Sequence, residues 1–380
     1  MRGMKTLRDI PKIENVPVLV RTALNVPIVD GKVSGSFRLR KALPTIEFLS
    51  RKHARVILIG HIGEKGTETL LPVYEAMKEF IPSLVFCPVS TGPIAREAIR
   101  SMPAGGVLML ENLRRHRGEI MNDETFAKEL ATLADVFVED SFDVCHRAHA
   151  SVVGVPTFLP SYAGLLVESE LKELGVALTP KSPSLAIIGG AKFSTKEPVL
   201  KRLLTLYDHV FVGGALANDF MKTRGLPVGK SLISSVGDTE IETLLQNPKL
   251  LLPLDYAVAP LGSTSSDARI ARIDSIEPDE AILDDGPETV AMLAAYVENA
   301  KTILWNGPLG NYENGFTDGT ESLARVIAKS RAHSMVGGGD TVTAIEKAKV
   351  SDRFSFISTG GGAMLDYLAN GRLPGIDALG

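Results

Sequence analysis

Short runs of hydrophobic residues recur along the chain, each bounded by glycine, proline or polar residues. They cover residues 16–24, 54–61, 83–89, 106–112 and 135–140, and then 184–191, 209–214, 254–260, 301–308, 333–339 and 354–361. Segments with a helical period of hydrophobic positions lie between most of them, at 39–52, 123–134, 197–207 and 320–330. Continuously apolar strands that alternate with helices are typical of parallel sheets covered on both faces. The pattern therefore predicts an α/β fold.

The predicted strands fall into two groups, separated by a helix-period segment at 161–183 that ends in prolines. A chain of 380 residues also exceeds the usual size of one domain. We therefore predict two doubly wound, Rossmann-like parallel-sheet domains joined by a helix, with a cleft between them. The expected boundaries are an N-terminal domain at 1–162, a hinge helix at 163–182, a C-terminal domain at 183–364, and a tail at 365–380 that packs back on the N-terminal domain.

Composition excludes several classes of protein. Lys and Arg number 41 against 45 Asp and Glu, which gives a net charge of -4. This sign argues against a general binder of nucleic acid or anionic membranes, so an anion site requires a local cluster of cations. Two cysteines are too few for a disulfide framework, and neither a signal peptide nor an apolar run of 18 residues is evident. We expect a cytoplasmic protein.

Five predicted strands of the second half end in glycine-rich sequence. The best example is 336–348, where three glycines follow a strand and a helix begins near Asp340 and Thr341. Glycine lets backbone N–H groups approach an anion closely, and a following helix adds its positive N-terminal end. One such turn would be explained by tight chain geometry alone. Five at corresponding positions favour a nucleotide site beyond the carboxyl ends of the strands.

The first half carries basic residues near predicted strand ends instead. The set comprises Arg21, Arg38, Arg114, Arg115 and Arg147, together with His61, His146 and His149. A single arginine of this kind is typically a solvated or ion-paired surface group. Several that converge on one site would hold a small, multiply charged anion, because the guanidinium fork matches phosphate and carboxylate.

Nine segments taken together resemble the phosphoglycerate kinase family, in that family's order and over nearly the whole chain. They are 21–27, 38–46, 60–63, 109–119, 139–151, 189–196, 305–313, 336–341 and 358–363. The combination of WNGP, GGAK, GGGDT and HRAHAS is highly specific, although each motif alone is weak. The resemblance implies a magnesium-dependent kinase that uses ATP and ADP as substrates.

The resemblance also implies roles for individual residues. Residues at positions that hold 3-phosphoglycerate or its acyl phosphate are Asn25, Arg38, His61, Arg114 and Arg147, and we add Arg21 as a further substrate-binding candidate. The nucleotide-binding positions fall into groups. Lys192 and Lys196 face the phosphates and the group in transfer, Gly213 and Gly214 lie at the adenine, Asn306 and Pro308 belong to the wall of the site, and Glu313 contacts the ribose. Gly337, Gly338, Gly339 and Thr341 lie at the phosphates, and Asp340 is the magnesium ligand. Arg38 and Lys196, one from each domain, are the expected catalytic residues.

Phosphoryl transfer depends mainly on in-line positioning and on neutralising charge. The acceptor carboxylate is already ionised at neutral pH, so no general base is required. We expect reversible transfer between 1,3-bisphosphoglycerate and ADP, giving 3-phosphoglycerate and ATP, in a cleft that closes between the domains. A monomer that binds only these small molecules is expected. The alternatives are a kinase that forms an acyl phosphate on another small carboxylic acid and a non-catalytic, nucleotide-binding descendant.

Two other motifs are rejected. Residues 225–231 resemble a Walker A loop, but three residues instead of four separate the two glycines. Cys145, His146 and His149 lack a fourth metal ligand at a suitable spacing.

Three residues depart from the family pattern. Ala23 replaces an aspartate that contacts the substrate hydroxyl, Glu64 replaces a phosphate-binding arginine, and Thr195 replaces an aspartate between the two lysines. A carboxylate that faces a phosphate is repulsive unless it turns away or is paired, and Lys65 or Arg115 is the candidate for supplying the missing charge. These changes predict weaker binding of 3-phosphoglycerate than is usual for the family.

We expect the double variant Ala23→Asp, Glu64→Arg to lower the KM for 3-phosphoglycerate, because it restores one hydroxyl contact and one phosphate-binding cation. Steady-state kinetics at saturating MgATP measures this. An unchanged KM would mean that the two positions do not face the substrate.

Overall fold

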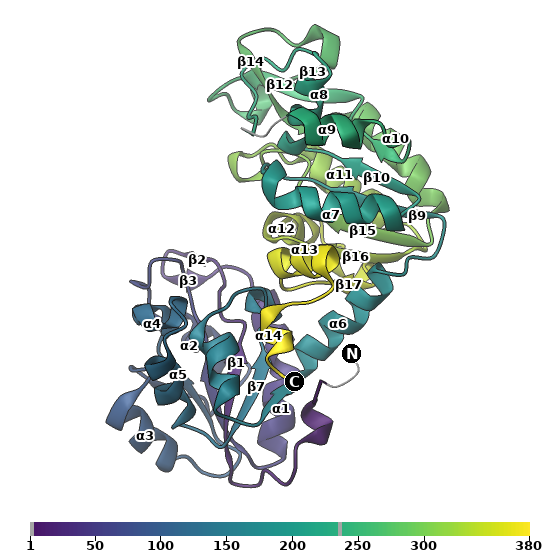
Figure 1. Cartoon of the computed structure of the whole chain (residues 1–380). Helices are drawn as coiled ribbons and strands as arrows, with labels where there is room; N and C mark the ends of the chain where they lie inside the picture. Colours follow the sequence, from purple (N-terminus) through teal and green to yellow (C-terminus); the bar gives the residue numbers. More distant parts are fainter. Residues whose placement is uncertain (1–3, 235–237) are drawn as a thin grey trace. The chain divides into compact units, whose positions relative to one another are not determined.

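The computed structural model describes residues 4–234 and 238–380, which form two compact units. Unit 1 contains the described residues up to Lys172 together with Arg372–Gly380, and unit 2 contains Glu173–Gly371. Helix α6 (Leu165–Ala177) crosses from one unit to the other. Each unit contains a parallel sheet with helices packed around it (Figure 1), so the predicted pair of doubly wound domains joined by a helix is confirmed.

In the described part of unit 1, the sheet has six strands in the order β5-β6-β4-β1-β7-β8, and all neighbours are parallel. The strands are β1 (Pro17–Thr22), β4 (Arg55–Ile59), β5 (Val85–Cys87), β6 (Val107–Leu110), β7 (Val136–Asp140) and β8 (Ser161–Ala163). The helices are α1 (Phe37–Arg51), α2 (Leu71–Lys78), α3 (Gly92–Arg100), α4 (Arg117–Ile120), α5 (Glu124–Ala131) and α14 (Pro374–Asp377). A short hairpin joins β2 (Ile28–Val29) to β3 (Lys32–Val33).

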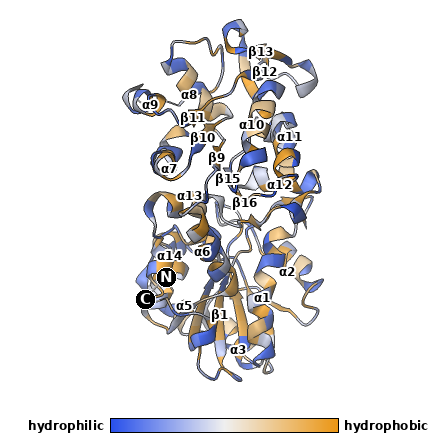
Figure 2. Cartoon of the chain, turned by 90° about the vertical axis from the view of Figure 1, so that its right-hand side faces the viewer, coloured by the Kyte–Doolittle hydropathy of each residue, from blue (hydrophilic) through white to orange (hydrophobic). Residues whose placement is uncertain are grey.

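The core of unit 1 follows from two periodicities. Alternate residues of β1, including Val18 and Val20, point to one face of the sheet and are completely buried there. Helix α1 covers them with Leu39, Ile46 and Leu49, which lie three to seven residues apart and so share one face of the helix. Figure 2 shows hydrophobic residues along the strands around β1 and more hydrophilic residues on the surrounding helices.

Short single-turn helices connect the larger elements of unit 1. They are η1 (Leu7–Asp9), η2 (Leu113–Arg115), η3 (Phe142–Val144), η4 (Ala150–Gly154) and η5 (Val155–Thr157). Two of them follow the carboxyl ends of strands, η2 after β6 and η3 after β7. The segments that contain η2 and follow η3 include the basic residues Arg114 and Arg147.

The sheet of unit 2, within the described residues, has the order β11-β10-β9-β15-β16-β17 and is also parallel. Its strands are β9 (Ser184–Ile188), β10 (His209–Val212), β11 (Leu250–Leu251), β15 (Thr302–Asn306), β16 (His333–Gly337) and β17 (Phe356–Ile357). The helices are α7 (Phe193–Leu206), α8 (Ala215–Thr223), α9 (Asp238–Leu245), α10 (Pro287–Asn299), α11 (Asp318–Ile327), α12 (Gly339–Lys347) and α13 (Gly361–Asn370). Further short turns are η6 (Ser265–Asp267), η7 (Ile273–Ser275), η8 (Tyr312–Asn314) and η9 (Ser351–Arg353).

One predicted strand does not join the parallel sheet. The run 254–260 forms β12 (Asp255–Pro260), which pairs antiparallel with β13 (Arg269–Arg272) and β14 (Glu280–Asp285) in a separate sheet. The connection from β12 to β13 is too short for the crossover that parallel strands need, so the chain turns back on itself. The prediction of an exclusively parallel arrangement is wrong at this point.

The C-terminal residues 372–380 belong to unit 1. The Gly375 N–H donates to the Cys145 carbonyl at 2.8 Å, and Leu373 and Leu379 are buried. A Cβ at Gly375 would lie 2.6 Å from the Val152 side chain and 3.0 Å from the Cys145 Cα, so only glycine allows this approach. None of the described helices is long and apolar enough to span a membrane.

We expect Gly375→Ala to lower the free energy of unfolding by about 1–3 kcal/mol, because the added methyl group overpacks the contact between α14 and Cys145. The matched control is Gly175→Ala in α6, where a Cβ would meet no atom within 4 Å. That substitution should stabilise the protein by about 0.5–1 kcal/mol through helix propensity. Thermal unfolding of both full-length variants gives the comparison, and a Gly375→Ala variant as stable as the wild type would contradict the packing argument.

Candidate functional site

Arg21 lies at the carboxyl end of β1 and has no exposed surface. Its Nε donates to Ser151 Oγ at 2.9 Å, and one terminal nitrogen donates to the Thr22 carbonyl at 3.0 Å and to Ser141 Oγ at 3.4 Å. The other terminal nitrogen lies 3.0 Å from His61 Nδ1. The guanidinium of this predicted substrate-binding residue is therefore surrounded by hydrogen-bonding groups of the protein itself, one of which is His61.

His61 is almost completely buried, and its protonation is restricted from two sides. Burial and the neighbouring guanidinium groups of Arg21 and Arg114 hold its pKa well below the usual 6.5. Because the guanidinium can only donate, Nδ1 of the neutral ring must accept, and the proton is on Nε2. His61 can therefore donate one hydrogen bond to an anion.

Arg114 and Arg147 add further positive charge to the same cluster. Arg114 lies in η2, is largely buried and donates through one terminal nitrogen to the Gly63 carbonyl. Burial, followed by the charges of Arg147 and Arg21, lowers its pKa. Its Nε has no hydrogen-bond partner among the described residues. A buried donor without an acceptor is costly, and an anionic ligand at this position would relieve that cost.

Asn25 and Arg38 meet at the neighbouring loop. An Arg38 terminal nitrogen donates to the Asn25 carbonyl at 2.5 Å, and the Gly63 N–H donates to Asn25 Oδ1 at 3.1 Å. The Asn25 amide group thus fixes the loop that follows β4. Arg38 remains partly exposed near the start of α1.

Glu111 and Asn112 organise the substrate loops, although sequence reasoning did not identify them. The Asn112 side chain bonds the backbone of Ile62 in both directions, at 3.3 and 2.9 Å, and donates to the Glu68 carbonyl at 2.9 Å. Glu111 accepts from the Leu70 N–H at 2.8 Å. The signal available in the sequence was a polar pair directly after the apolar run 106–110, but its partners lie more than 40 residues away.

The residues that depart from the family pattern have distinct environments. Ala23 is completely buried and offers no polar group. Glu64 is exposed, and its negative charge opposes the lowering of the Arg114 pKa. Arg115, a candidate for replacing the missing arginine, forms an ion pair with Glu111 at 3.0 Å. Its positive charge is therefore already compensated by a carboxylate of the protein.

A cavity of about 630 Å³ lies beyond the carboxyl ends of β9, β10 and β15 in unit 2. Five predicted nucleotide-binding residues line it, namely Lys192, Gly214, Pro308, Glu313 and Asp340. Its wall also contains Leu232, Leu261, Ile282, Leu283, Leu309 and Tyr312, which sequence reasoning missed because they come from four separate segments. The volume and mostly apolar wall suit a nucleotide-sized ligand.

Lys196 lies on the first turn of α7 at the end of β9. Its Nζ donates to Asn306 Oδ1 at 3.2 Å, and burial lowers its pKa from 10.5 to about 8. Asn306 also donates to the Gly361 carbonyl at 3.3 Å, so its amide orientation is fixed. Gly190 has φ +101°, a backbone conformation that favours glycine, and its Cα lies next to this lysine, since a Cβ there would be in van der Waals contact with Nζ at 3.4 Å.

The predicted phosphate-binding glycines lead directly into α12. Gly338 has φ +103°, and a Cβ at Gly337 would lie 2.5 Å from Met364 Sδ. Thr341 is completely buried and its hydroxyl accepts from the Gly307 N–H at 3.1 Å, so it joins this turn to the WNGP segment. Gly213 is restricted similarly, since its Cβ would lie 2.4 Å from Asp285.

Three carboxylates line the cavity, and Asp340 and Glu313 are the two that could hold a divalent cation, because Asp284 already accepts backbone N–H groups. Burial and the charge of Glu313 raise the pKa of Asp340, so this position favours a compensating positive charge. Magnesium is commonly bound by one or two carboxylates together with substrate phosphates, so these residues fit it. No cluster of three or more His, Cys, Asp or Glu suited to a metal occurs within 4–234 and 238–380.

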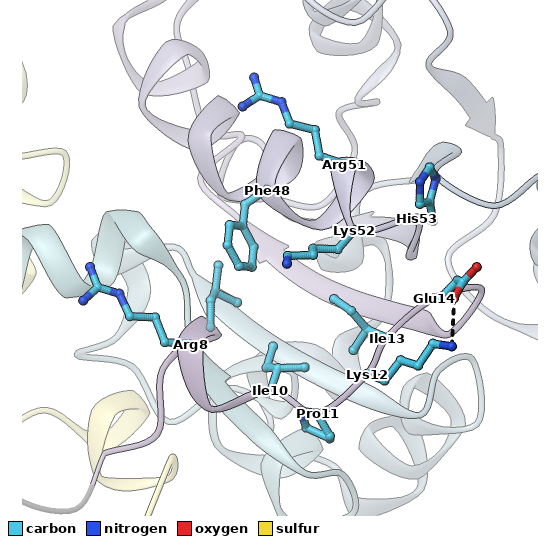
Figure 3. A pocket seen from close by; sticks show the side chains of 11 residues that line it. Arg8, Ile10, Pro11, Lys12, Ile13, Glu14, Phe48, Arg51, Lys52 and His53 are labelled. Atoms are coloured by element: carbon cyan, nitrogen blue, oxygen red, sulfur yellow. Dashed lines mark ion pairs between the residues drawn. The ribbon is translucent and has the colours of Figure 1, made fainter.

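A second hollow, of about 670 Å³, lies in unit 1 between residues 7–14 and the end of α1 (Figure 3). It contains none of the predicted site residues. Two of its cations are already paired, Lys12 with Glu14 at 3.0 Å and Arg51 with Glu47 at 2.6 Å. We therefore assign it no part in the reaction, despite its larger volume.

Comparison with known proteins gives one consistent result. A family model described as phosphoglycerate kinase matches residues 7–371. The phosphoglycerate kinase of Pelotomaculum thermopropionicum is 42% identical over 388 residues, covering 99% of this chain and 98% of the relative. The solved phosphoglycerate kinase from Coxiella burnetii superposes with a TM-score of 0.81 at 36% identity, covering 99% of both chains. That from Pyrococcus horikoshii OT3 gives a TM-score of 0.89 at 30% identity, covering 99% of this chain and 98% of the other.

We expect the affinity of the unit 2 cavity for MgADP to fall as the pH rises through about 8, because Lys196 then loses its proton and with it an attraction for the phosphates. Calorimetric titrations between pH 6.5 and 9.5 would follow this change. In Lys196→Arg the guanidinium stays charged, so the decline should disappear. A decline of equal size in that variant would assign the titration to another group.

Proposed function

The chain belongs to the phosphoglycerate kinase family, and from this premise we propose how its two units share the reaction. The reaction is reversible phosphoryl transfer between 1,3-bisphosphoglycerate and ADP, which gives 3-phosphoglycerate and ATP. The observation that carries the assignment to residues is the half-buried Lys196, which follows β9 and lies beside a cavity of nucleotide size. An ammonium group at the phosphate end of a nucleotide stabilises the charge that develops during transfer.

In unit 1, the acid substrate binds to the cluster around His61. The Nε2–H of His61, the unsatisfied Nε of Arg114 and the exposed guanidinium of Arg147 supply the donors. Asn25 and Arg38 bind the carboxyl end, while Arg21 acts on the acid through His61 instead of by contact. Three separate donors around one small anion suit a molecule that carries both a phosphate and a carboxylate.

In unit 2, the nucleotide occupies the cavity lined by Gly214 and Pro308, with its ribose at Glu313 and its phosphates at the N-terminal end of α12. Asp340 would hold Mg²⁺, and the charge of Glu313 acts on the same position. When bound, the ion neutralises charge on the phosphate oxygens. Lys192 and Lys196 bind the transferring group from the start of α7.

The attacking oxygen is an ionised carboxylate, so the reaction proceeds without a general base. Arg38 and Lys196 come from different units, and transfer requires both substrates within bonding distance. We therefore propose that the units close around the substrates by bending at the connecting segment, which also excludes water. We further propose that the protein acts as a monomer in the cytoplasm and binds neither nucleic acid nor membranes, in keeping with its net charge of -4.

The environment of Ala23 and Glu64 favours one alternative acceptor class. The buried methyl group of Ala23 offers no hydrogen bond, and the negative charge of Glu64 acts on Arg114, so both positions are less favourable for a phosphorylated hydroxy acid. A second small carboxylic acid is therefore the alternative acceptor. A panel of such acids with MgATP distinguishes the two, since the preferred acceptor gives the higher kcat/KM.

We expect the protein to transfer phosphate from MgATP to 3-phosphoglycerate with a turnover of at least about 10 s⁻¹. In Lys196→Ala this rate should fall by about 100-fold or more, because a donor to the transferring group is lost. Coupled reduction of the acyl phosphate measures the product. Absence of transfer at saturating substrate, in protein that still binds MgATP, would contradict the assignment of the acceptor.

A further inference from the structure

Glu119 in α4 is a buried carboxylate to which neither the motifs nor the proposed reaction assigns a role. It has no exposed surface. One oxygen accepts from the Ser151 N–H at 2.9 Å, and the other accepts from the Ser151 hydroxyl at 2.6 Å. Burying a carboxylate is costly unless it is hydrogen-bonded or faces a cation, so this position requires a compensating interaction.

Two cations compensate this carboxylate: its charge acts directly on Arg114, and a second cation, Arg21, is reached through Ser151. Its hydroxyl has one proton, which is donated to Glu119, and its lone pair accepts the Arg21 Nε–H at 2.9 Å. The direction of both bonds is thus determined by the carboxylate. His149 does not compete for the charge, because its Nδ1 lies 4.0 Å from Glu119, and burial with the nearby arginines lowers its pKa to about 4.

The guanidinium of Arg21 also forms a hydrogen bond with His61. Arg21 donates to His61 Nδ1 at 3.0 Å, which leaves the Nε2–H of the ring for the substrate. A continuous chain of hydrogen bonds therefore runs from Glu119 through Ser151 and Arg21 to His61, and all four residues are at least nine-tenths buried.

We propose that Glu119 is a positioning residue for acid-substrate binding: through Ser151 it orients Arg21, and Arg21 in turn holds His61 as the tautomer that donates to the substrate. The inference rests on the proposed role of His61 at the acid substrate. Glu119 itself touches no substrate. Its contribution lies in keeping one donor aimed before the substrate arrives, which lowers the cost of ordering the site on binding.

Glutamine in place of Glu119 would break this chain. Its amide can accept from the Ser151 N–H, but its NH₂ group then faces the Ser151 hydroxyl and donates to it. The proton of the Ser151 hydroxyl then has no acceptor, and where it points toward Arg21 it repels the Nε–H that the hydroxyl oxygen had accepted. In Ser151→Ala the carboxylate remains but the link to Arg21 is lost, so both variants should affect His61 in the same way.

The experiment uses the full-length protein as Glu119→Gln, as Ser151→Ala and as the double variant. Calorimetry without nucleotide gives the Kd for 3-phosphoglycerate, and ¹⁵N chemical shifts report the His61 tautomer. We expect each single variant to raise the Kd by roughly tenfold, since an oriented bond to a charged group is lost. The double variant should match the single ones, because both act on one chain. The Kd for MgADP should not change.

The matched control is Asp140→Asn, a buried carboxylate of the same unit that accepts from the Leu166 N–H at 2.9 Å. It should alter the melting temperature without changing the Kd for 3-phosphoglycerate. An equal rise in Kd in this control would reduce the effect to general destabilisation and overturn the proposal.

Three results on the test variants would also overturn the proposal. The first is an unchanged or lower Kd in Glu119→Gln; a lower Kd would mean that the charge of Glu119 opposes binding. The second is a His61 ring that stays in the Nε2–H tautomer in both single variants. The third is a pair of single-variant effects that multiply in the double variant. Should Glu119→Gln fail to fold, Ser151→Ala alone carries the test. Because binding is measured without transfer, a wild-type protein that binds 3-phosphoglycerate but does not transfer phosphate would contradict the proposed function and leave this inference testable.

Discussion

Parallel pairing of the strands is the constraint from which the remaining features of both units follow. Pairing of Arg21 in β1 with Ile59 in β4 and with Glu139 in β7 brings three distant segments to one edge of the unit 1 sheet. The loops that continue from these strands carry His61 and Ser141. Since parallel strands all end at the same edge, residues far apart in sequence meet there without any specific attraction between the loops.

The two units solve different electrostatic problems at these edges. Unit 1 keeps several arginines close together in the absence of substrate, which is unfavourable by mutual repulsion. The buried acceptors Ser151 Oγ, Ser141 Oγ and the Thr22 carbonyl hold the Arg21 guanidinium, and they leave open the side of the cluster that we propose for the acid. Unit 2 relies more on backbone N–H groups, because Gly338 leads into α12, and the half-buried ammonium group of Lys196 donates to Asn306.

In unit 2 the backbone segments at the strand ends lie so close to their neighbours that some positions have no room for a side chain. A Cβ at Gly189 would lie 2.2 Å from the Pro308 carbonyl oxygen, and one at Gly213 would lie 2.4 Å from Asp285. Glycines at these positions let β9, β10 and β15 end close together and form the cavity wall. The glycine-rich strand ends seen in the sequence therefore serve packing, and anion binding at these turns stays a prediction.

The sequence by itself determined the fold class, the presence of two parallel sheets and the family, because hydrophobic period and motif order are local properties of the chain. It placed Lys192 and Asp340 at strand ends, and the structure brings both to one cavity. The antiparallel pairing of β12 was missed, since an apolar run looks the same in either direction. Only the tertiary structure decided that Arg21 lies behind His61 and that Glu119 supports it. Their partners lie 130, 40 and 32 residues apart along the chain, and burial of a polar group depends on every segment that surrounds it.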